Sequence, residues 1–364
     1  MKFIDSFIDV TKYAKKLPTS EYLDSGKYPI IDQGQKQIAG YTDIEEGLFT
    51  DVPAIIFGDH TRVIKYIDTP FFIGADGVKV IKCLDGGADY KYCYYLLKSA
   101  RIPDTGYNRH FKWLKESVFP EHNKQQQKQI VDTLTATDKL MCKYNVEANK
   151  LDMLIKSRFS EMFGMIKIND KGWNIVALKR IADIRGRVGW KGYKKEDLRE
   201  SGPIVLGATH LTDNGDLDLS APVHLSREKY EESPEIVLQK NDLIFTQRGN
   251  TIGKVGLVAE DIGEATINPC VLIIRPLNVN PIYLKTYFII DDTKDDMWML
   301  NSGSAQPMIT QKGIGEYHLI LPPIALQNQF ADFVTKVDQQ KATVQKSIDK
   351  LDTLKKSLMQ EYFG

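Results

Sequence analysis

Two stretches of about 40 residues contain no glycine and no proline, at positions 123–163 and 324–363. A stretch of this length without either residue predicts one long helix, about 60 Å from end to end at 1.5 Å per residue. In both stretches an apolar residue recurs at every seventh position. These positions are Leu134, Met141, Ala148, Ile155 and Met162 in the first stretch and Phe330, Val337, Val344, Leu351 and Leu358 in the second. A heptad repeat predicts that each helix packs along another helix.

The heptads predict that the two long helices pack antiparallel against each other within one chain. Further apolar residues stand beside the heptad positions: Leu140, Leu151, Leu154, Val334, Ile348 and Tyr362. Three polar residues, Thr137, Lys341 and Lys355, interrupt the pattern. A lone helix with such interruptions would be marginally stable, whereas two paired helices cover each other's apolar stripe. The alternative is that each helix docks separately on its own globular segment.

The residues that precede each long helix have a different character. Segments 1–119 and 165–322 contain short runs of β-branched and aromatic residues, such as 53–58 and 268–276, between turns rich in glycine, aspartate and asparagine. Such runs predict β-strands, while residues 90–100 predict a short helix. Strands, turns and short helices follow in the same order in both segments. The pattern predicts an α+β fold with two globular, β-rich domains separated by the two antiparallel helices.

The ends of the two long helices repeat one sequence. Residues 150–164 read KLDMLIKSRFSEMFG and residues 350–364 read KLDTLKKSLMQEYFG, with nine of the fifteen positions identical. An internal repeat of this size predicts a pseudo-twofold architecture. The glycine that ends the first copy, Gly164, fits a helix C-cap. We therefore divide the chain into a globular domain at 1–119, a helix at 120–164, a second globular domain at 165–322 and a helix at 323–364.

The composition is that of a globular protein without a membrane or secretion signal. Hydrophobic residues make up 42% and charged residues 26% of the chain, and the formal net charge is zero. There is no apolar run of 18 residues and no basic-then-apolar N-terminus, so we expect a cytoplasmic protein. The four cysteines form no C-x-x-C pair, which argues against structural zinc.

One window is strongly basic although the whole chain is neutral. Between residues 171 and 195, eight lysines and arginines accompany a single acid, Asp183. A local basic face of this kind suits a polyanionic partner such as nucleic acid. The alternative is a solvated surface strip with no partner.

The sequence contains no convincing catalytic motif. Residues 249–254, GNTIGK, resemble a phosphate-binding loop, but three residues instead of four separate the glycines, and Val255 stands where Ser or Thr would hold magnesium. We interpret this fragment as a turn into a strand. The tripeptide at 268–270, NPC, lacks the second proline and the aromatic residue of amino-methyltransferase motifs, and the six histidines have no metal-binding spacing. These absences favour a binding protein over an enzyme.

The chain resembles the DNA-specificity subunit of type I restriction–modification enzymes. The resemblance rests on the helix openings EHNKQQQKQIVDTL from Glu121 and PPIALQNQFADFV from Pro322, on the endings SRFSEMFG and SLMQEYFG, and on FTQRGNTIGKVGLV followed by NPCVLIIRP. It covers the whole chain. The first domain departs more, because it is shorter and has GDHTRVIKY at 58–66 where the second domain has its glycine-rich turn.

The resemblance implies two target-recognition domains that read a bipartite sequence in double-stranded DNA, held at a fixed separation by the helices. It implies a non-catalytic subunit of a host-defence complex. The partners would be two modification (methyltransferase) subunits that methylate adenines and restriction (translocase/nuclease) subunits that cleave DNA. S-adenosylmethionine, ATP and magnesium are then expected on those partners, and no cofactor is expected in this chain.

Base reading requires side chains such as Arg, Lys, Gln or Asn that reach a groove, whereas Lys and Arg on phosphates supply affinity. In the first domain we predict DNA contacts from His60, Arg62, Lys65, Tyr107, Asn108, Arg109 and Lys112. In the second domain we predict them from Arg185, Arg187, Lys191, Gln247, Arg248, Lys254, Gln306 and Thr310. Residues 106–114 mix basic and aromatic side chains as nucleic-acid surfaces do. The alternative for Phe111 and Trp113 is a place in the core.

Two other functions stay open at this point. The first is a self-sufficient DNA methyltransferase or nuclease, which methyl transfer by the isolated chain would reveal. The second is a structural coiled-coil adaptor that never touches DNA. An adaptor would show no salt-sensitive DNA binding with any partner.

Overall fold

The computed structural model describes residues 1–364 except 75, 107, 188–191 and 301–307. The chain divides into two compact units, one made of Met1–Asn145 and Lys346–Gly364 and the other of Val146–Gln345. Each unit therefore contains one β-rich domain and one half of each long helix. Among the described residues, no helix combines the length and the apolar character needed to cross a membrane.

The first unit contains a four-stranded antiparallel sheet and a three-stranded mixed sheet. The larger sheet has the order β1 (Phe7–Asp9), β7 (Val78–Cys83), β4 (Ala54–Gly58), β5 (Ile64–Ile67), and the smaller has the order β3 (Gly40–Thr42), β2 (Tyr28–Ile31), β6 (Phe72–Ile73). Strands β2 and β6 are parallel. Two helices follow the larger sheet, α1 (Tyr90–Lys98) and α2 (Phe111–Glu116).

The second unit contains sheets of the same two kinds. The larger sheet has the order β9 (Ala182–Arg185), β15 (Val271–Pro276), β12 (Leu243–Thr246), β13 (Val255–Leu257), and the smaller has the order β11 (His224–Leu225), β10 (Leu198–Leu206), β14 (Ala265–Ile267). A further strand pair joins β8 (Asn174–Ala177) to β16 (His318–Leu321). The short helices are α4 (Arg227–Glu231), α5 (Pro281–Ile289), α6 (Asp291–Met299) and α7 (Gln311–Gly315). Short 3-10 turns occur in both units at Phe3–Asp5, Thr11–Tyr13, Thr19–Glu21, Leu178–Arg180, Lys195–Asp197, Ala208–His210 and Pro234–Ile236.

The two domains have one topology despite their different sequences. Strands β1, β7, β4 and β5 occupy the same order as β9, β15, β12 and β13, and every pairing in both larger sheets is antiparallel. In each smaller sheet the central strand, β2 or β10, pairs antiparallel with one neighbour and parallel with the other. The α+β class and the internal repeat predicted from the sequence are confirmed. The turn between β4 and β5, at 59–63, corresponds to the turn between β12 and β13, at 247–254.

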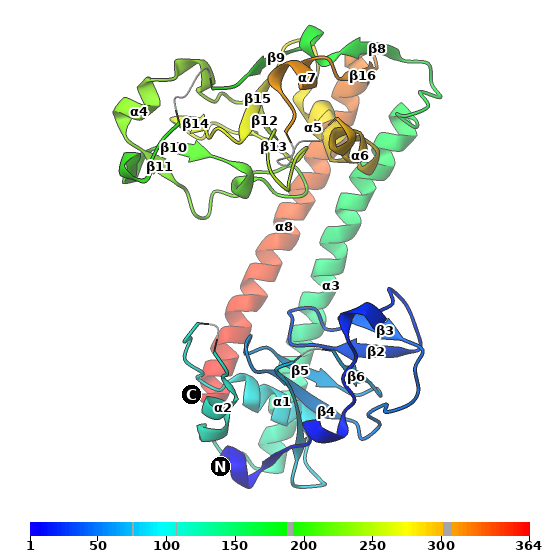
Figure 1. Cartoon of the computed structure of the whole chain (residues 1–364), viewed down its shortest axis with the longest axis vertical. Helices are drawn as coiled ribbons and strands as arrows, with labels where there is room; N and C mark the ends of the chain where they lie inside the picture. Colours follow the sequence, from blue (N-terminus) through cyan, green and yellow to red (C-terminus); the bar gives the residue numbers. More distant parts are fainter. Residues whose placement is uncertain (75, 107, 188–191, 301–307) are drawn as a thin grey trace. The chain divides into compact units, whose positions relative to one another are not determined.

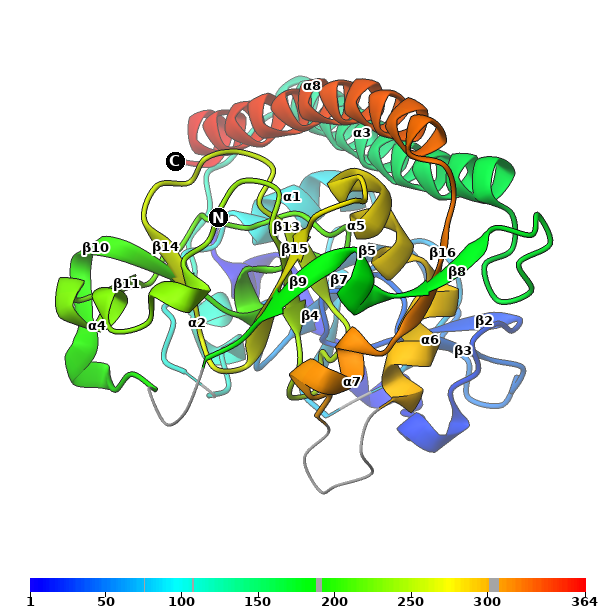
Figure 2. The same cartoon turned by 90° about the horizontal axis from the view of Figure 1, so that it is seen from above.

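The long helices are α3 (Lys124–Phe163) and α8 (Ile324–Phe363), which run antiparallel and side by side within each unit (Figures 1 and 2). Asn123 and Gln126 begin α3 with a reciprocal cap, in which each side chain accepts from the other residue's backbone N–H at 2.9 Å. Gly164 ends α3 at φ +81° and Gly364 ends α8 at φ +85°. The predicted C-cap at Gly164 is confirmed.

The predicted seam is confirmed in part. Leu134 and Phe330 are fully buried, and Ile155, Val337 and Val344 are buried as well. The prediction is wrong for two of the additional apolar positions. Leu140 is 39% and Leu154 is 45% exposed, so neither is buried in the seam. A heptad pattern alone does not distinguish such outward positions from the seam.

Two of the polar interruptions are ion pairs between the helices. Lys341 of α8 lies 2.6 Å from Asp152 of α3 in the second unit, and Lys355 of α8 pairs with Asp138 of α3 in the first. The two pairs are two heptads apart on each helix, in opposite chain directions. Both units therefore have the same antiparallel register, with the lysines on α8 and the aspartates on α3.

We expect Asp138→Ala to destabilise the first unit by about 1–2 kcal/mol, because the mutation leaves the largely covered ammonium of Lys355 without its partner. It also removes the acceptor of the Tyr95 hydroxyl, 2.9 Å away on α1. Asp352→Ala is the matched control. Its partner Lys356 is 77% exposed, so the change should cost less than about 0.5 kcal/mol. Equal shifts of the two thermal unfolding midpoints would contradict this expectation.

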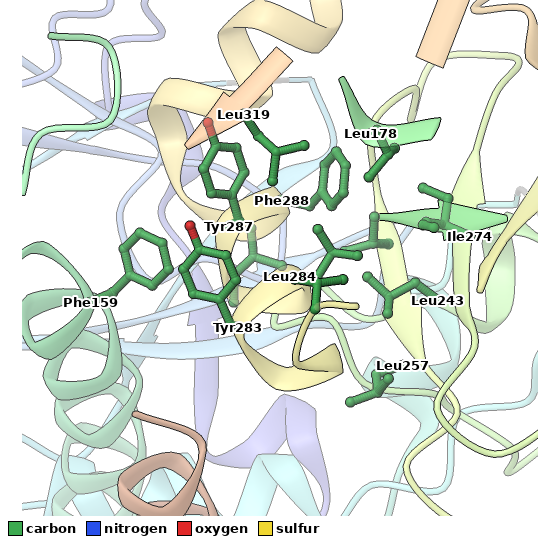
Figure 3. Close-up of a cluster of buried hydrophobic side chains, with 14 of the residues drawn as sticks. Phe159, Leu178, Leu243, Leu257, Ile274, Tyr283, Leu284, Tyr287, Phe288 and Leu319 are labelled. Atoms are coloured by element: carbon green, nitrogen blue, oxygen red, sulfur yellow. The ribbon is translucent and has the colours of Figure 1, made fainter. Parts of the chain in front are cut away.

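An aromatic cluster joins the helices to the second domain (Figure 3). Phe159 of α3 stacks on Tyr283 of α5 with ring centroids 5.5 Å apart and an 18° angle between the planes. Phe159 also meets Phe163 at 4.8 Å and Phe330 of α8 at 5.5 Å. All four side chains are fully buried. The cluster therefore fixes α3, α8 and α5 to one another within this unit.

One hydrogen bond at the start of each long helix has an equivalent at the start of the other. The Gln127 side chain donates to the carbonyl of His122, and the Gln327 side chain donates to that of Pro322, both at 2.8 Å. Gln127 and Gln327 are 200 positions apart, and so are His122 and Pro322, which is the same offset that separates the two copies of the repeat. The entry into the long helix is therefore built in the same way in both units.

Candidate nucleic-acid interface

Three loops of the first domain come together at one end of its larger sheet. They are residues 32–38, residues 59–63, and residues 104–106 with 108–110, which we call the first edge. Asp59, only 3% exposed, holds two of them together. Its carboxylate accepts from the Phe111 backbone N–H at 2.7 Å, and its carbonyl accepts from the His110 N–H at 2.7 Å. The edge is thus positioned by buried hydrogen bonds and not only by loop contacts at the surface.

The first edge brings together four of the residues predicted from the sequence, and a fifth, Lys112, follows it on α2. The His60 ring Nδ1 lies 3.2 Å from the carbonyl of Asn108, and the Arg62 guanidinium lies 2.7 Å from Asp104. Asn108, Arg109 and Lys112 are exposed. The Lys112 ammonium sits 4.1 Å from the Trp113 ring centroid, on α2. Phe111 is buried in the core, as its alternative interpretation proposed. DNA contact by these five residues stays a prediction.

Electrostatics at the first edge favour an anion less than the bare residue count suggests. The backbone N–H of Gly106 and the Arg62 guanidinium lower the pKa of Asp104, so this carboxylate is charged and neutralises part of Arg62. Lys16 chiefly, and Arg109 as well, lower the pKa of the Asp76 carboxylate, so Arg109 also acts on an acid. Lys36 and Arg109 on this edge, and Lys112 just after it on α2, are exposed cations.

Of the two other residues predicted for the first domain, the structure describes only Lys65. Lys65 lies in β5 with 3% of its surface exposed, and its ammonium bonds to the carbonyl of Lys36 at 2.6 Å and to Asp32 at 3.3 Å. Burial lowers the pKa of the Lys65 ammonium, and the hydrogen bond and charge of Asp32 oppose that effect. Lys65 therefore holds a loop from beneath. Tyr107 lies outside the described residues.

The sequence-based prediction missed the loop at 32–38. It carries Gln33, Gln35, Lys36 and Gln37 beside the turn that contains His60 and Arg62. The available signal was a run of three alternating glutamines directly after a strand. This run of glutamines could not be recognised as part of the edge from the sequence, because only the folded chain brings the loop to the β4–β5 turn.

The second domain has a corresponding edge at 247–254, 268–270 and 308–311, which we call the second edge. The Gln247 side chain donates to the Pro269 carbonyl at 3.0 Å, and the Ile309 N–H donates to the Gln247 carbonyl at 2.9 Å. The exposed Arg248 pairs with Met308 in an antiparallel bridge. Gln247 and Arg248 are thus brought next to Thr310. Fragment 249–254 leads into β13, so its interpretation as a turn is confirmed.

Four predicted residues of the second domain, Arg185, Arg187, Lys254 and Thr310, have interaction partners within that domain. Arg185 lies 2.6 Å from Asp183, and Lys254 lies 2.9 Å from Asp213. Arg187 donates to the Ile267 carbonyl at 3.2 Å, and burial lowers the pKa of its guanidinium. The Thr310 hydroxyl caps α7 by accepting from the Gly313 N–H at 3.0 Å. Lys191 and Gln306 lie outside the described residues.

Another candidate surface is a stripe repeated on the two long helices. It consists of Lys150, Leu154, Ser157 and Glu161 on α3 and of Lys350, Leu354, Ser357 and Glu361 on α8. The spacing of four, three and four residues places each set on one helix face. All eight residues are exposed, including the leucines at 45% and 47%. The stripe is thus duplicated in sequence although it is not needed for the packing of either unit.

The larger-sheet turns of both domains carry polar side chains at equivalent places, which is the arrangement expected of two readers on one scaffold. Residues 170–353 match the family model described as the type I restriction modification DNA specificity domain. The chain belongs to this family. As a type I DNA specificity subunit, it is a DNA-recognition component of a restriction–modification system.

Individual relatives agree over nearly the full length of the specificity subunit. The EcoR124I/EcoR124II specificity subunit of Escherichia coli is 21% identical over 358 residues, covering 92% of this chain and 85% of the relative. The type I S subunit from M. genitalium aligns with a TM-score of 0.57 and 19% identity, covering 100% of this chain and 95% of that chain. A chain from a study of complex assembly and conformational transition in a type I R-M system aligns with a TM-score of 0.50 and 15% identity, covering 98% and 96%.

Among the described residues, no group of three or more His, Cys, Asp or Glu side chains is placed to hold a metal ion. The chemistry visible at the two edges of the specificity subunit is that of hydrogen bonding and charge. Arg, Asn and Gln side chains are the groups that recognise base edges, and Lys and Arg are those that contact phosphates.

Proposed function

We propose that this specificity subunit reads a bipartite DNA target, one part with each edge, and thereby directs adenine methylation and cleavage by partner subunits. The observation that carries the proposal is one topology with two different sets of edge residues. The first edge presents His60, Arg62 and Arg109, whereas the second presents Gln247 and Arg248. A common scaffold with different readers suits a target whose two parts differ in sequence.

The partners in this proposal are two modification subunits, joined by restriction subunits for cleavage. The repeated stripe supports two copies of one partner, because an identical exposed surface on two helices offers two equivalent binding places. S-adenosylmethionine, ATP and magnesium belong to those partners in this proposal. The specificity subunit then contributes recognition and no catalytic group.

The decisive measurement is genome-wide adenine methylation in cells with and without this chain, in the presence of its modification partner. We expect a split motif to be methylated only when the chain is present. We expect Arg109→Ala to relax base preference in one part of the motif and Arg248→Ala to relax it in the other, each by roughly tenfold. Lys240→Ala, an exposed cation at the far end of β12, is the control and should leave the motif unchanged.

The alternatives give different results in the same system. Methyl transfer from S-adenosylmethionine to DNA by the purified chain alone would indicate a self-sufficient enzyme. Unchanged methylation after removal of the chain, together with no salt-sensitive binding of the complex to duplex DNA, would indicate an adaptor.

A further inference from the structure

The loop at 32–38 is held unusually firmly for a surface loop. The Asp32 carboxylate accepts from the Gly34 N–H at 2.9 Å and from the buried Lys65 ammonium. Lys65 also donates to the carbonyl of Lys36 at 2.6 Å. A lysine buried to this degree loses hydration that its hydrogen bonds must offset. The fold therefore uses a buried charge to fix the backbone of this loop.

Gln33 connects the loop to the β4–β5 turn through two oxygens and to Asp76 through its side-chain nitrogen. Its side-chain oxygen accepts from the His60 N–H at 3.1 Å, and its carbonyl accepts from the Thr61 hydroxyl at 2.6 Å. Its side-chain nitrogen donates to the Asp76 carbonyl at 3.0 Å. On the far side, the Gln37 side chain donates to the Tyr66 carbonyl at 2.9 Å. The loop and the turn thus form one rigid part of the first edge.

Between these fixed points, Gln35 and Lys36 are exposed. Gln35 lines a polar groove of about 530 Å³ together with Thr61 and Arg62. A glutamine carboxamide matches the donor and acceptor pair of adenine in the major groove, and a lysine matches the acceptors of guanine. Held in place before binding, such side chains lose less conformational entropy on contact than those of a mobile loop.

The corresponding loop of the second domain lacks this chemistry. Residues 207–223 follow β10 as 32–38 follow β2, and they contain no glutamine, lysine or arginine. They contain three aspartates, of which Asp213 pairs with Lys254 and Asp216 with Lys285. A reading loop at this position is therefore a feature of the first domain alone.

We propose that Gln35 and Lys36 contact base edges in the part of the target bound by the first domain, with Lys65 as the positioning residue that holds their loop. The inference rests on the proposed function and adds to it a specificity-determining element. It changes the role of Lys65 from a DNA contact to a support for two contacts.

The test is the methylated motif of cells that carry the modification partner and full-length variants of this chain. We expect Gln35→Ala and Lys36→Ala to relax base preference roughly tenfold at one or two positions in a single part of the motif. Lys65→Met should relax the same positions, and Lys65→Arg, which keeps a donor, should restore them in part. Gln239→Ala and Lys27→Ala are matched controls. Both residues are exposed. Gln239 precedes β12 and Lys27 precedes β2, so each lies at the end of its strand opposite to the edge.

Each outcome bears on the proposal. The proposal is supported if Gln35→Ala, Lys36→Ala and Lys65→Met all relax base preference in one part of the motif and neither control variant does. An unchanged motif in Gln35→Ala and Lys36→Ala overturns it, and so does a uniform loss of methylation at every site, which is the pattern of phosphate contact without base reading. If the unmodified chain directs no methylation, the proposed function fails and this inference fails with it. If the chain without substitutions directs methylation and the variants methylate the same motif, only the inference fails.

Discussion

Phe159→Ala is expected to destabilise the second unit by about 3–5 kcal/mol, the largest single effect we predict for stability. The ring is fully buried and contacts aromatic side chains on α3, α5 and α8, so its removal leaves a cavity where three helices meet. Hydrogen exchange should become faster at 155–163, 281–289 and 324–334. The first unit, which shares none of these contacts, should keep its protection.

Phe159→Met is the matched control for this cavity, because methionine occupies the equivalent position in the repeat, at Met359. A flexible side chain of similar volume should cost less than about 1.5 kcal/mol. Equal loss of protection in both variants would show that ring stacking matters more than filled volume. Unchanged exchange in Phe159→Ala would contradict the packing role of the cluster.

Leu154→Asp is expected to remove one modification subunit from the complex, and Leu354→Asp is expected to remove one as well. Each leucine is half-exposed at the centre of one copy of the repeated stripe, where a partner would cover it. The double variant should bind no modification subunit. The mass of the assembled complex, measured on single particles, would report the number of bound partners.

Met153→Asp is the control for the stripe. Met153 neighbours Leu154 and is 66% exposed, but its counterpart in the other helix is Thr353, so it is not part of the repeated surface. We expect two partners to stay bound in this variant. All three single changes lie at exposed helix positions and should cost less than about 1 kcal/mol of stability. Two bound partners in Leu154→Asp and Leu354→Asp would exclude the stripe as the binding surface.

The long helices could be predicted almost to the residue. The first was expected at 123–163 and spans Lys124–Phe163, and the second was expected at 324–363 and spans Ile324–Phe363. The success has a local cause, since breaker-free sequence, a capping pair and a terminal glycine act within a few residues of one another. The face that each helix buries was less predictable. Leu154 satisfies the heptad rules as well as Leu151 does, yet only Leu151 packs against the core.

The candidate DNA contacts show the opposite balance. Residue type alone selected Lys65 and overlooked Gln35, although the first is buried and the second is exposed. The pairing of β2 with β6 and of β4 with β5 brings a loop and a turn together across 27 residues of chain, as the bond from the His60 N–H to Gln33 shows. No local pattern encodes that approach.

By itself, the sequence determined the class of the protein, its duplicated plan and its two long helices, because helix propensity, breakers and an internal repeat are written in consecutive residues. Only the tertiary structure showed that two domains of different sequence share one topology. It also decided which lysines hold loops in place and which residues lie at the two edges. Those features depend on strand pairing and burial between residues far apart in the chain, where the same side chain serves as a contact or as a support according to what covers it.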